Sequence, residues 1–175
     1  NGEVKEIKIL YTIKKFNYII NYYYDEVLNN SKTETNIPYG TRVNSQDYYL
    51  KENEIRDGYI LDTVKSDNSS YTIIDNTVVI NIYYKKNSYE YSVNYFFNNE
   101  KGFTNNSEAI YGDKITARSK WLTNEELNAK GKNDYFLDPN KTEENNSEIT
   151  IGTDSSKNVL DIYYINTNFD NITET

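Results

Sequence analysis

The clearest pattern along the chain is an alternation of apolar and polar positions in two short blocks, residues 18–24 and 79–84. In an extended chain, four residues of the first block lie on one side: Tyr18, Ile20, Tyr22 and Tyr24. Alternation with a period of two is typical of a strand that buries one face. The sequence therefore predicts an opening strand and a closing strand whose apolar faces point towards a core.

Both blocks occur twice in the chain. Residues 18–24 match residues 91–97 at a step of 73, and residues 79–84 match residues 159–164. Shorter matches follow in the same order: Tyr39-Gly40 with Tyr111-Gly112, Tyr59 to Asp62 with Tyr135 to Asp138, and Tyr71 to Ile73 with Ile149 to Ile151. Such agreement indicates an internal repeat. We therefore expect repeat one over residues 17–86, repeat two over residues 87–166, and a C-terminal tail over residues 167–175.

The N-terminal residues carry part of the same pattern. Residues 7–11 align with residues 80–84, again at a step of 73. We therefore predict that residues 1–16 are the closing strand of a preceding repeat. The chain starts at Asn1 and contains no Met, so we expect it to be a piece of a longer protein.

The signals between the opening and closing strands are weaker. Residues 32–36 are predicted as a second strand that ends at a turn, where Gly40 adopts a positive φ at little cost. Repeat two is longer than repeat one, with its insertion between Lys114 and Asn158.

A short helix is expected within this insertion, at residues 124–130. Thr123 and Glu126 have the spacing of a capping box, and Gly131 follows where a C-terminal cap would lie.

The connection between the repeats is short and contains no flexible residues. Residues 85–90 include neither Gly nor Pro. The seven steps from Tyr84 to Tyr91 span at most about 23–25 Å when fully extended. We therefore predict that successive repeats stack end to end as an elongated, semi-rigid rod, monomeric within a larger surface protein.

The composition narrows the classes of partner. Aromatic residues make up 15% of the chain and include 19 Tyr, so tyrosine must supply much of the core. The 19 basic and 27 acidic residues give a net charge of −8, which provides no electrostatic reason to bind nucleic acid. No apolar run approaches the roughly 18 residues that a membrane span needs. We therefore expect neither nucleic-acid binding nor membrane insertion.

Cysteine and histidine are both absent, which removes disulfides, thiolate metal sites, thiol nucleophiles and imidazole bases. The carboxylate pairs Asp25-Glu26 and Glu125-Glu126 consist of sequence neighbours, whose side chains point in different directions. We therefore predict no catalytic site, no enzyme activity, no metal site and no cofactor. An internal Lys–Asn isopeptide bond stays an open alternative, which intact mass would test.

The outward face of the predicted strands also carries aromatic residues, Tyr23 with Tyr83 and Phe96 with Tyr163. If the opening and closing strands are neighbours, each pair forms an aromatic ladder. One interpretation is a cross-strand pair that stabilises the sheet. The other is a ligand-binding platform on which sugar rings stack. Trp121, the only Trp, is the fifth candidate for ligand binding, with a core anchor as the alternative.

The order of the blocks resembles the mucin-binding-protein repeat (MucBP-like) family of Gram-positive cell-surface proteins. The resemblance rests on the alternating aromatic strand at residues 18–24, Asp25-Glu26-Val27, Tyr39-Gly40, Gly58-Tyr59 and the paired aromatics Tyr83-Tyr84. Repeat two departs from it, because Asn98-Asn99 and Asp134-Tyr135 stand at two of these places. The resemblance implies a compact β-grasp or ubiquitin-like fold and secreted proteins attached to the cell wall.

These observations favour a mainly β (α+β) chain with two tandem small domains and a short helix in the second. The function that we expect is an adhesive or spacer stalk on the cell surface. The alternative is a specific binding module for a host glycan or glycoprotein such as mucin.

Overall fold

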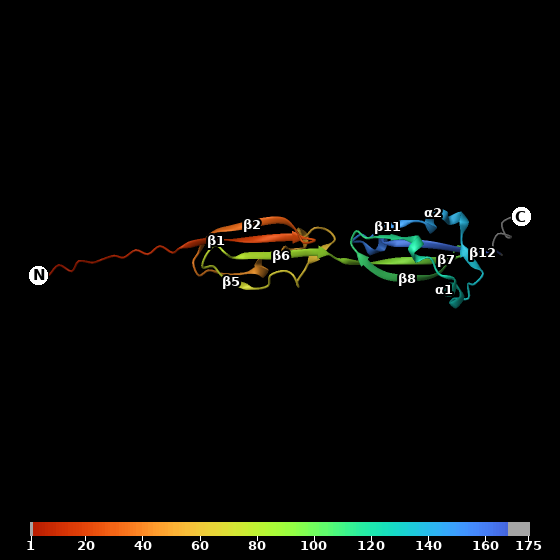
Figure 1. The fold of residues 1–175 in the computed structure, drawn as a ribbon, viewed down its shortest axis with the longest axis horizontal. Helices are drawn as coiled ribbons and strands as arrows, with labels where there is room; N and C mark the ends of the chain where they lie inside the picture. Colours follow the sequence, from red (N-terminus) through yellow and green to blue (C-terminus); the bar gives the residue numbers. More distant parts are fainter. Residues whose placement is uncertain (1, 168–175) are drawn as a thin grey trace. The chain divides into compact units, whose positions relative to one another are not determined.

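The computed structural model describes residues 2–167, which form two compact units that meet between Lys85 and Lys86 (Figure 1). Strands dominate both units, and the helices are few and short. Each unit contains a four-stranded sheet and a separate two-stranded sheet. The chain is therefore a mainly β protein built from two small units.

Repeat one begins with a long hairpin and ends with a strand that returns to its centre. Its strands are β1 (Lys15–Tyr24), β2 (Val27–Pro38), β3 (Arg42–Asn44), β4 (Tyr59–Leu61), β5 (Ser70–Thr72) and β6 (Val79–Lys86). The main sheet has the order β2-β1-β6-β4, and β3 pairs with β5. Short 3-10 helices at Ser45–Tyr48 and Glu52–Glu54 lie between β3 and β4.

Repeat two has the same strand arrangement. Its elements are β7 (Ser88–Phe97), β8 (Glu100–Ile110), β9 (Lys114–Thr116), α1 (Asn124–Ala129), β10 (Tyr135–Leu137), α2 (Thr142–Asn145), β11 (Glu148–Thr150) and β12 (Val159–Asn166). Three 3-10 helices lie at Ala117–Lys120, Pro139–Lys141 and Ser155–Lys157. The main sheet has the order β10-β12-β7-β8, and β9 pairs with β11.

The first and last strands of each repeat are parallel neighbours, as the ladder prediction required. Strands β1 and β6 lie side by side in register from Ile19 and Val79 onward, and β7 pairs with β12 in the same way (Figure 1). Because the two strands are parallel, the chain enters each repeat at one end of its sheet and leaves at the other.

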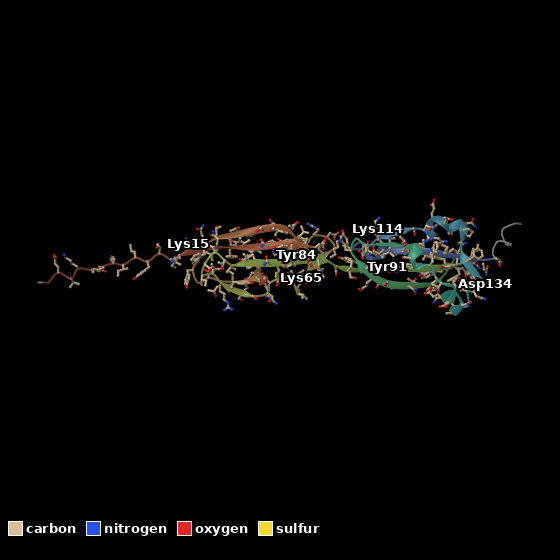
Figure 2. The ribbon with its side chains drawn as sticks, in the orientation of Figure 1. Lys15, Lys65, Tyr84, Tyr91, Lys114 and Asp134 are labelled. Carbon is tan, nitrogen blue, oxygen red and sulfur yellow. The ribbon has the colours of Figure 1, made fainter. Side chains whose placement is uncertain are left out.

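The predicted core faces are confirmed. All the residues on the predicted core faces are buried: Tyr18, Ile20, Tyr22, Tyr24, Ile80, Ile82 and Tyr84 in repeat one, and Tyr91, Val93, Tyr95, Phe97, Leu160, Ile162 and Tyr164 in repeat two. Tyr84 and Tyr91, labelled in Figure 2, are 2% and 3% exposed. Burial raises the pKa of Tyr84 and of Tyr95 to about 12, because the ionised phenolate loses its hydration.

The two repeats share individual hydrogen bonds as well as strand order. The N–H of Leu50 donates to Tyr84 Oη at 2.8 Å, and the N–H of Leu122 donates to Tyr164 Oη at 2.7 Å. Four further bonds recur: Gly40 N–Ile73 O with Gly112 N–Ile151 O, Ser45 N–Ser69 O with Ala117 N–Ser147 O, Tyr22 Oη–Tyr48 O with Tyr95 Oη–Lys120 O, and Asp62 N–Tyr83 O with Asp138 N–Tyr163 O. The internal repeat therefore extends to single contacts.

The second strand is longer than the sequence predicts. Strand β2 starts at Val27, only two residues after β1, and not at residue 32. Asp25 and Glu26 both adopt positive φ, 49° and 68°, which is the geometry of a tight hairpin turn. The prediction was too short because β2 is an edge strand with almost no buried side chains, so it shows no apolar alternation.

The structure also changes the start of repeat one. Residues 2–14 belong to no strand in the described part of the chain, and Ile7 and Tyr11 are 84% and 88% exposed. Phe16 was assigned to the preceding segment, but it pairs with Ile37 in the β1–β2 hairpin and packs against the core. The closing strand of a preceding repeat stays a prediction. Residues 168–175 of the predicted tail lie outside the described residues.

The predicted short helix is confirmed. The residues that make repeat two longer are inserted at three places rather than one. Thr123 and Glu126 form the capping box of α1. Matched positions lie 72 residues apart at Leu50 and Leu122, 76 at Tyr59 and Tyr135, 78 at Ile73 and Ile151, and 80 at Ile80 and Leu160. The added residues therefore occur at α1, near α2 and before β12.

Candidate ligand-binding site

The outward aromatic residues form two stacked pairs at the same place in each repeat. Tyr23 of β1 and Tyr83 of β6 are register partners with ring centroids 4.5 Å apart and an interplanar angle of 12°. Phe96 and Tyr163 are partners in β7 and β12, at 4.7 Å and 15°. All four side chains are half-buried. The structure therefore brings each predicted pair together.

The stacked geometry leaves little ring surface for a ligand. Each ring lies nearly parallel to its partner, so one face of each ring is covered within the pair. In repeat two, Lys141 Nζ lies 5.0 Å from the Tyr163 ring centroid and 3.5 Å from a carboxylate oxygen of Glu144. This geometry favours a cross-strand pair that stabilises the sheet. Ligand binding by these residues stays a prediction.

Polar side chains bridge the same two strands beside each aromatic pair. Asn21 Nδ2 donates to Asn81 Oδ1 at 3.1 Å in repeat one. Asn94 Nδ2 donates to Asp161 Oδ1 at 2.8 Å in repeat two. In both repeats, the first and last strands are therefore joined on their outer face by a hydrogen bond and a ring stack, in addition to the backbone bonds.

Trp121 belongs to the core of repeat two. Its ring is half-buried against the apolar cluster, and its Nε1 donates to the Asn145 carbonyl at 2.9 Å. The guanidinium of Arg118 lies 5.5 Å from the ring. These contacts are those of a core anchor, and ligand binding by Trp121 stays a prediction.

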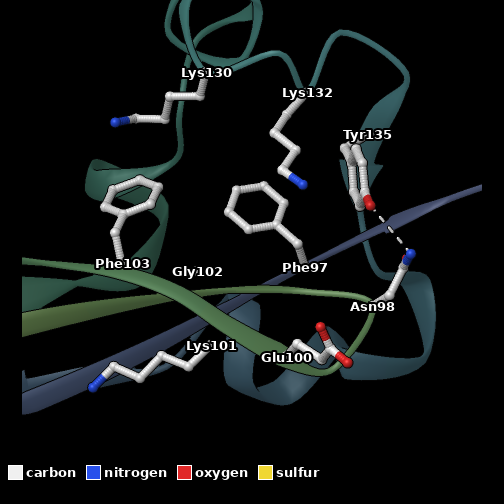
Figure 3. A pocket seen from close by; sticks show the side chains of 9 residues that line it. All are labelled: Phe97, Asn98, Glu100, Lys101, Gly102, Phe103, Lys130, Lys132 and Tyr135. Atoms are coloured by element: carbon white, nitrogen blue, oxygen red, sulfur yellow. Dashed lines mark hydrogen bonds between the residues drawn. The ribbon is translucent and has the colours of Figure 1, made fainter.

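A groove that the sequence did not reveal lies in repeat two (Figure 3). Its volume is about 520 Å³, within the roughly 300–1,000 Å³ of small-molecule sites. Phe97 and Phe103 form the aromatic base, Tyr135 closes one side, and Lys130 and Lys132 extend over the rings. The groove therefore combines apolar ring surface with two cations.

The lysine ammonium groups lie close to the rings. Lys130 Nζ is 3.9 Å from the Phe103 ring centroid. Lys132 Nζ is 5.0 Å from the Phe97 centroid and 4.7 Å from that of Tyr135. These distances are those of cation–π contacts. Asn98 Nδ2 donates to Tyr135 Oη at 3.2 Å, which fixes the phenol at the end of the groove.

The end of α1 sets the positions of both lysines. Gly131 adopts a φ of +66° between them. Its N–H donates to the Asn128 carbonyl at 2.9 Å, and the N–H of Lys132 donates to the Leu127 carbonyl at 2.9 Å. These two bonds are the Schellman arrangement that ends a helix. The sequence signal that predicted this cap therefore also marks the residues that build the groove.

The base of the groove depends on a bulge in β8. Tyr95 pairs with Phe103 and Phe96 pairs with Lys101, so Gly102 is the extra residue. A Cβ atom at Gly102 would lie 2.7 Å from Cδ2 of Phe97. Glycine at this bulge therefore allows the Phe97 ring to lie against the strand.

Repeat one has the same bulge but fills it differently. Asn29 is the extra residue there, and its Oδ1 accepts a 2.9 Å hydrogen bond from Arg56 Nη2. The Arg56 guanidinium lies 4.3 Å from the Tyr24 ring centroid and 5.4 Å from that of Tyr59. Arg56 and Lys132 are matched, because each precedes its tyrosine by three residues. The aromatic groove is therefore a property of repeat two.

The described part of the chain offers no other obvious chemistry. Within residues 2–167, no three carboxylate, His or Cys side chains gather as metal ligands. No helix in the same residues is long and apolar enough to cross a membrane.

Comparison with solved structures gives slight likenesses, one of them to Mub-RV. The crystal structure of Mub-RV aligns with 86% of this chain and 98% of that chain, at 11% sequence identity and a TM-score of 0.29. This similarity is too low to carry an argument about fold or function. No family model matches the chain. No curated protein matches it either.

Proposed function

We propose that this chain is a tandem-repeat region of a bacterial cell-surface protein and acts as an adhesive spacer that resists pulling. We place it outside the cell, attached to the wall of a Gram-positive bacterium, and assign it no enzymatic activity. Each repeat is proposed to be a β-grasp-like unit of the MucBP-like class, and successive units to stack as a rod.

The observation that carries the proposal is the parallel pairing of the first and last strands in each repeat. The chain enters and leaves each unit at opposite ends of this pair. Only Asn87 separates β6 from β7, so the last strand of one repeat leads directly into the first strand of the next. This connection suits domains arranged in series.

Parallel end strands also determine how a repeat responds to force. Tension on the chain pulls β1 and β6 in opposite directions along their length. All the hydrogen bonds between these strands then bear the force together, whereas pulling from one end would break them one after another. The Tyr23–Tyr83 stack and the Asn21–Asn81 bond join the same strands and oppose the same sliding motion.

Single-molecule pulling tests the spacer role. Pulling the chain by its termini loads β1–β6 and β7–β12 in shear. In the control, repeat one is pulled through cysteines introduced at Asn17 and Thr77, two exposed positions at the same end of β1 and β6. The chain has no native Cys, so the attachment is unique. We expect a clearly higher unfolding force for repeat one in shear than in the control, and equal forces would reject the proposal.

The outer-face contacts allow a second test within one molecule. Replacing Tyr23 and Tyr83 by Ser should lower the unfolding force of repeat one. Repeat two keeps its Phe96–Tyr163 stack and serves as the internal control. A variant that unfolds at the same force as the parent would show that the aromatic pairs do not resist pulling.

A second candidate function is a specific binding module for a host glycan or glycoprotein. The observation that favours it is the aromatic and cationic groove, which occurs in repeat two alone among the described residues. A binding module and a spacer are compatible, because the groove lysines Lys130 and Lys132 follow α1 and lie outside the two strands that resist sliding.

A further inference from the structure

The cationic groove of repeat two has a charge that contrasts with the rest of the chain. The protein carries a net charge of −8. Within residues 2–167, neither Lys130 nor Lys132 forms an ion pair, whereas six other lysines do. Figure 3 shows Glu100 and Lys101 on the other side of the β8 strand from the rings. Glu100 and Lys101 also line the groove and carry opposite charges, so Lys130 and Lys132 leave the groove with a net positive charge.

We propose that this groove binds an acidic saccharide, a sugar that bears a carboxylate or a sulfate. The anionic group lies between the Lys130 and Lys132 ammonium groups and makes charge-assisted hydrogen bonds. One face of the Phe103 ring is stacked on Tyr95, so the ammonium groups turn from the rings to the anion, and the apolar C–H face of the sugar takes their place on Phe103 and Tyr135. A partly dry aromatic base strengthens the attraction between the anion and the lysines, because the local dielectric is lower than in water.

The dimensions favour a saccharide over a longer acidic ligand. A volume of about 520 Å³ accommodates a small ligand, and the surrounding net negative charge opposes an extended anionic polymer. Residues 100–103 of β8 line the groove, and β8 is an edge strand of its sheet, so its backbone is open to pairing with a peptide. An acidic peptide is therefore the competing occupant that the experiment has to reject.

The counterpart in repeat one indicates which changes created the site. There a hollow of about 390 Å³ includes Tyr24, Asn29 and Asn30, which align with Phe97, Gly102 and Phe103. Repeat one has one cation over its rings, Arg56, which donates to Asn29. Repeat two has two, Lys130 and Lys132, and adds the Phe103 ring, which is the change that recognition of an anion requires.

Titration of the whole chain with matched ligands tests the proposal. The probes are lactose, 3′-sialyllactose, 6-sulfated lactose and an acidic tripeptide, with binding measured from NMR shifts. We expect the carboxylated or the sulfated sugar to perturb Phe97, Phe103 and Tyr135, and to bind at least about tenfold more tightly than lactose. Binding should weaken as NaCl increases, because the attraction is electrostatic.

Variants locate the binding in the groove. Lys130→Gln with Lys132→Gln should weaken binding of the acidic sugar at least about tenfold. Lys114→Gln removes a lysine of β9 that does not line the groove and should leave binding unchanged. Gly102→Asn introduces the side chain of repeat one and should displace the Phe97 ring and weaken binding. Trp121 fluorescence during urea unfolding checks that each variant remains folded.

The outcomes separate this inference from the spacer role. Equal binding of lactose, tighter binding of the acidic tripeptide, no binding at millimolar concentrations, or full binding by the double lysine variant would each overturn the assignment. None of these results changes the force at which either repeat unfolds in shear, which tests the proposed function independently.

Discussion

The two repeats form equivalent backbone hydrogen bonds with different side chains. They differ most around the groove of repeat two. Tyr83 N donates to Ser66 Oγ at 2.8 Å, whereas Tyr163 N donates to Asn145 Oδ1 at 2.8 Å. The backbone N–H at this position of the last strand therefore has a side-chain acceptor in both repeats, although the accepting residue differs. The groove of repeat two lies at a strand bulge that repeat one also has, but it includes additional residues at the end of α1. The groove therefore differs from repeat one both at the inserted residues of α1 and at Gly102 and Phe103 of the edge strand β8.

The hairpin turns give the same lesson on a smaller scale. Asp25-Glu26 and Asn98-Asn99 seem unrelated in sequence, yet all four residues have positive φ, between 49° and 68°. Asn adopts this conformation with less strain than Glu. In repeat one, Asp25 Oδ2 accepts a 2.6 Å hydrogen bond from Tyr59 Oη, and Glu26 pairs with Lys65. These contacts offset part of the cost of the acidic turn.

The largest expected effect comes from emptying matched core positions. Ile82 and Ile162 are both 0% exposed, so replacing either by Ala should cost about 3–4 kcal/mol of the free energy of unfolding of its repeat. Trp121 lies in repeat two, so its fluorescence reports on that repeat, while circular dichroism reports on both. Ile162→Ala should shift the fluorescence transition in urea. A shift of equal size from Ile82→Ala would show that the repeats do not unfold independently.

A smaller loss of stability should distinguish Ser66 from Asn145, the two side chains that accept a hydrogen bond from the backbone of the last strand. Asn145 is 3% exposed, and its Nδ2 donates to the carbonyls of Asp138 and Tyr163 at 3.1 and 3.2 Å. Asn145→Ala leaves the Tyr163 N–H without its partner and removes one of the two donors to each carbonyl, and it should cost about 2–3 kcal/mol.

Ser66→Ala is the matched variant in repeat one. It removes one hydroxyl that bonds only Tyr83, through its N–H and its carbonyl, and should cost about 1 kcal/mol. Hydrogen exchange at the amides of Tyr83 and Tyr163 measures each loss. Equal protection in both variants would contradict the contrast between the repeats.

The acid sensitivity of repeat one should depend on Asp62. Burial alone would raise the pKa of this carboxyl, but the N–H groups of Lys65 and Val64, together with the Lys85 ammonium at 3.6 Å, hold the pKa below its ordinary value. The charged carboxylate therefore stabilises the fold above about pH 4, and this contribution is lost as the pH falls through the lowered pKa. Asp62→Asn should cost about 1 kcal/mol at pH 7.

The Asp62→Asn variant should also lose stability less steeply than the parent between pH 5 and pH 2, measured by thermal unfolding. Asp138→Asn in repeat two is the matched control, since Asp138 forms no lysine ion pair within residues 2–167. A parent-like acid dependence in Asp62→Asn would reject the role of this carboxylate.

The smallest effect concerns the turn residues. Glu26→Gly relieves the positive φ and should stabilise repeat one by about 0.5 kcal/mol, after subtracting the exposed Lys65 pair. Asn99→Gly should give less in repeat two, because Asn already tolerates this conformation. Chemical denaturation of the paired variants checks the order, and a larger gain at Asn99 would reverse the comparison.

The sequence predicted the strands in which buried and exposed side chains alternate. It predicted less well a strand such as β2, whose side chains are exposed on both faces. Strands β1, β6, β7 and β12 follow from their apolar periodicity, and α1 follows from the cap residues Thr123 and Gly131. Strand β2 was predicted too short because an edge strand carries few apolar side chains. The stacked pairs followed from register, but the groove did not, because Phe103 stands alone in a polar strand and its partners are distant in sequence.

The sequence by itself determined that the chain repeats, which faces are buried and where each repeat opens and closes. Local periodicity and cap chemistry are sufficient for this, since they depend on neighbours along the chain. Only the tertiary structure decided that the Tyr23–Tyr83 rings cover each other and that Phe97, Phe103 and Tyr135 meet beneath two lysines. Those arrangements depend on strand register, on the bulge at Gly102 and on the path of the chain after α1, and these bring together residues that no local pattern connects.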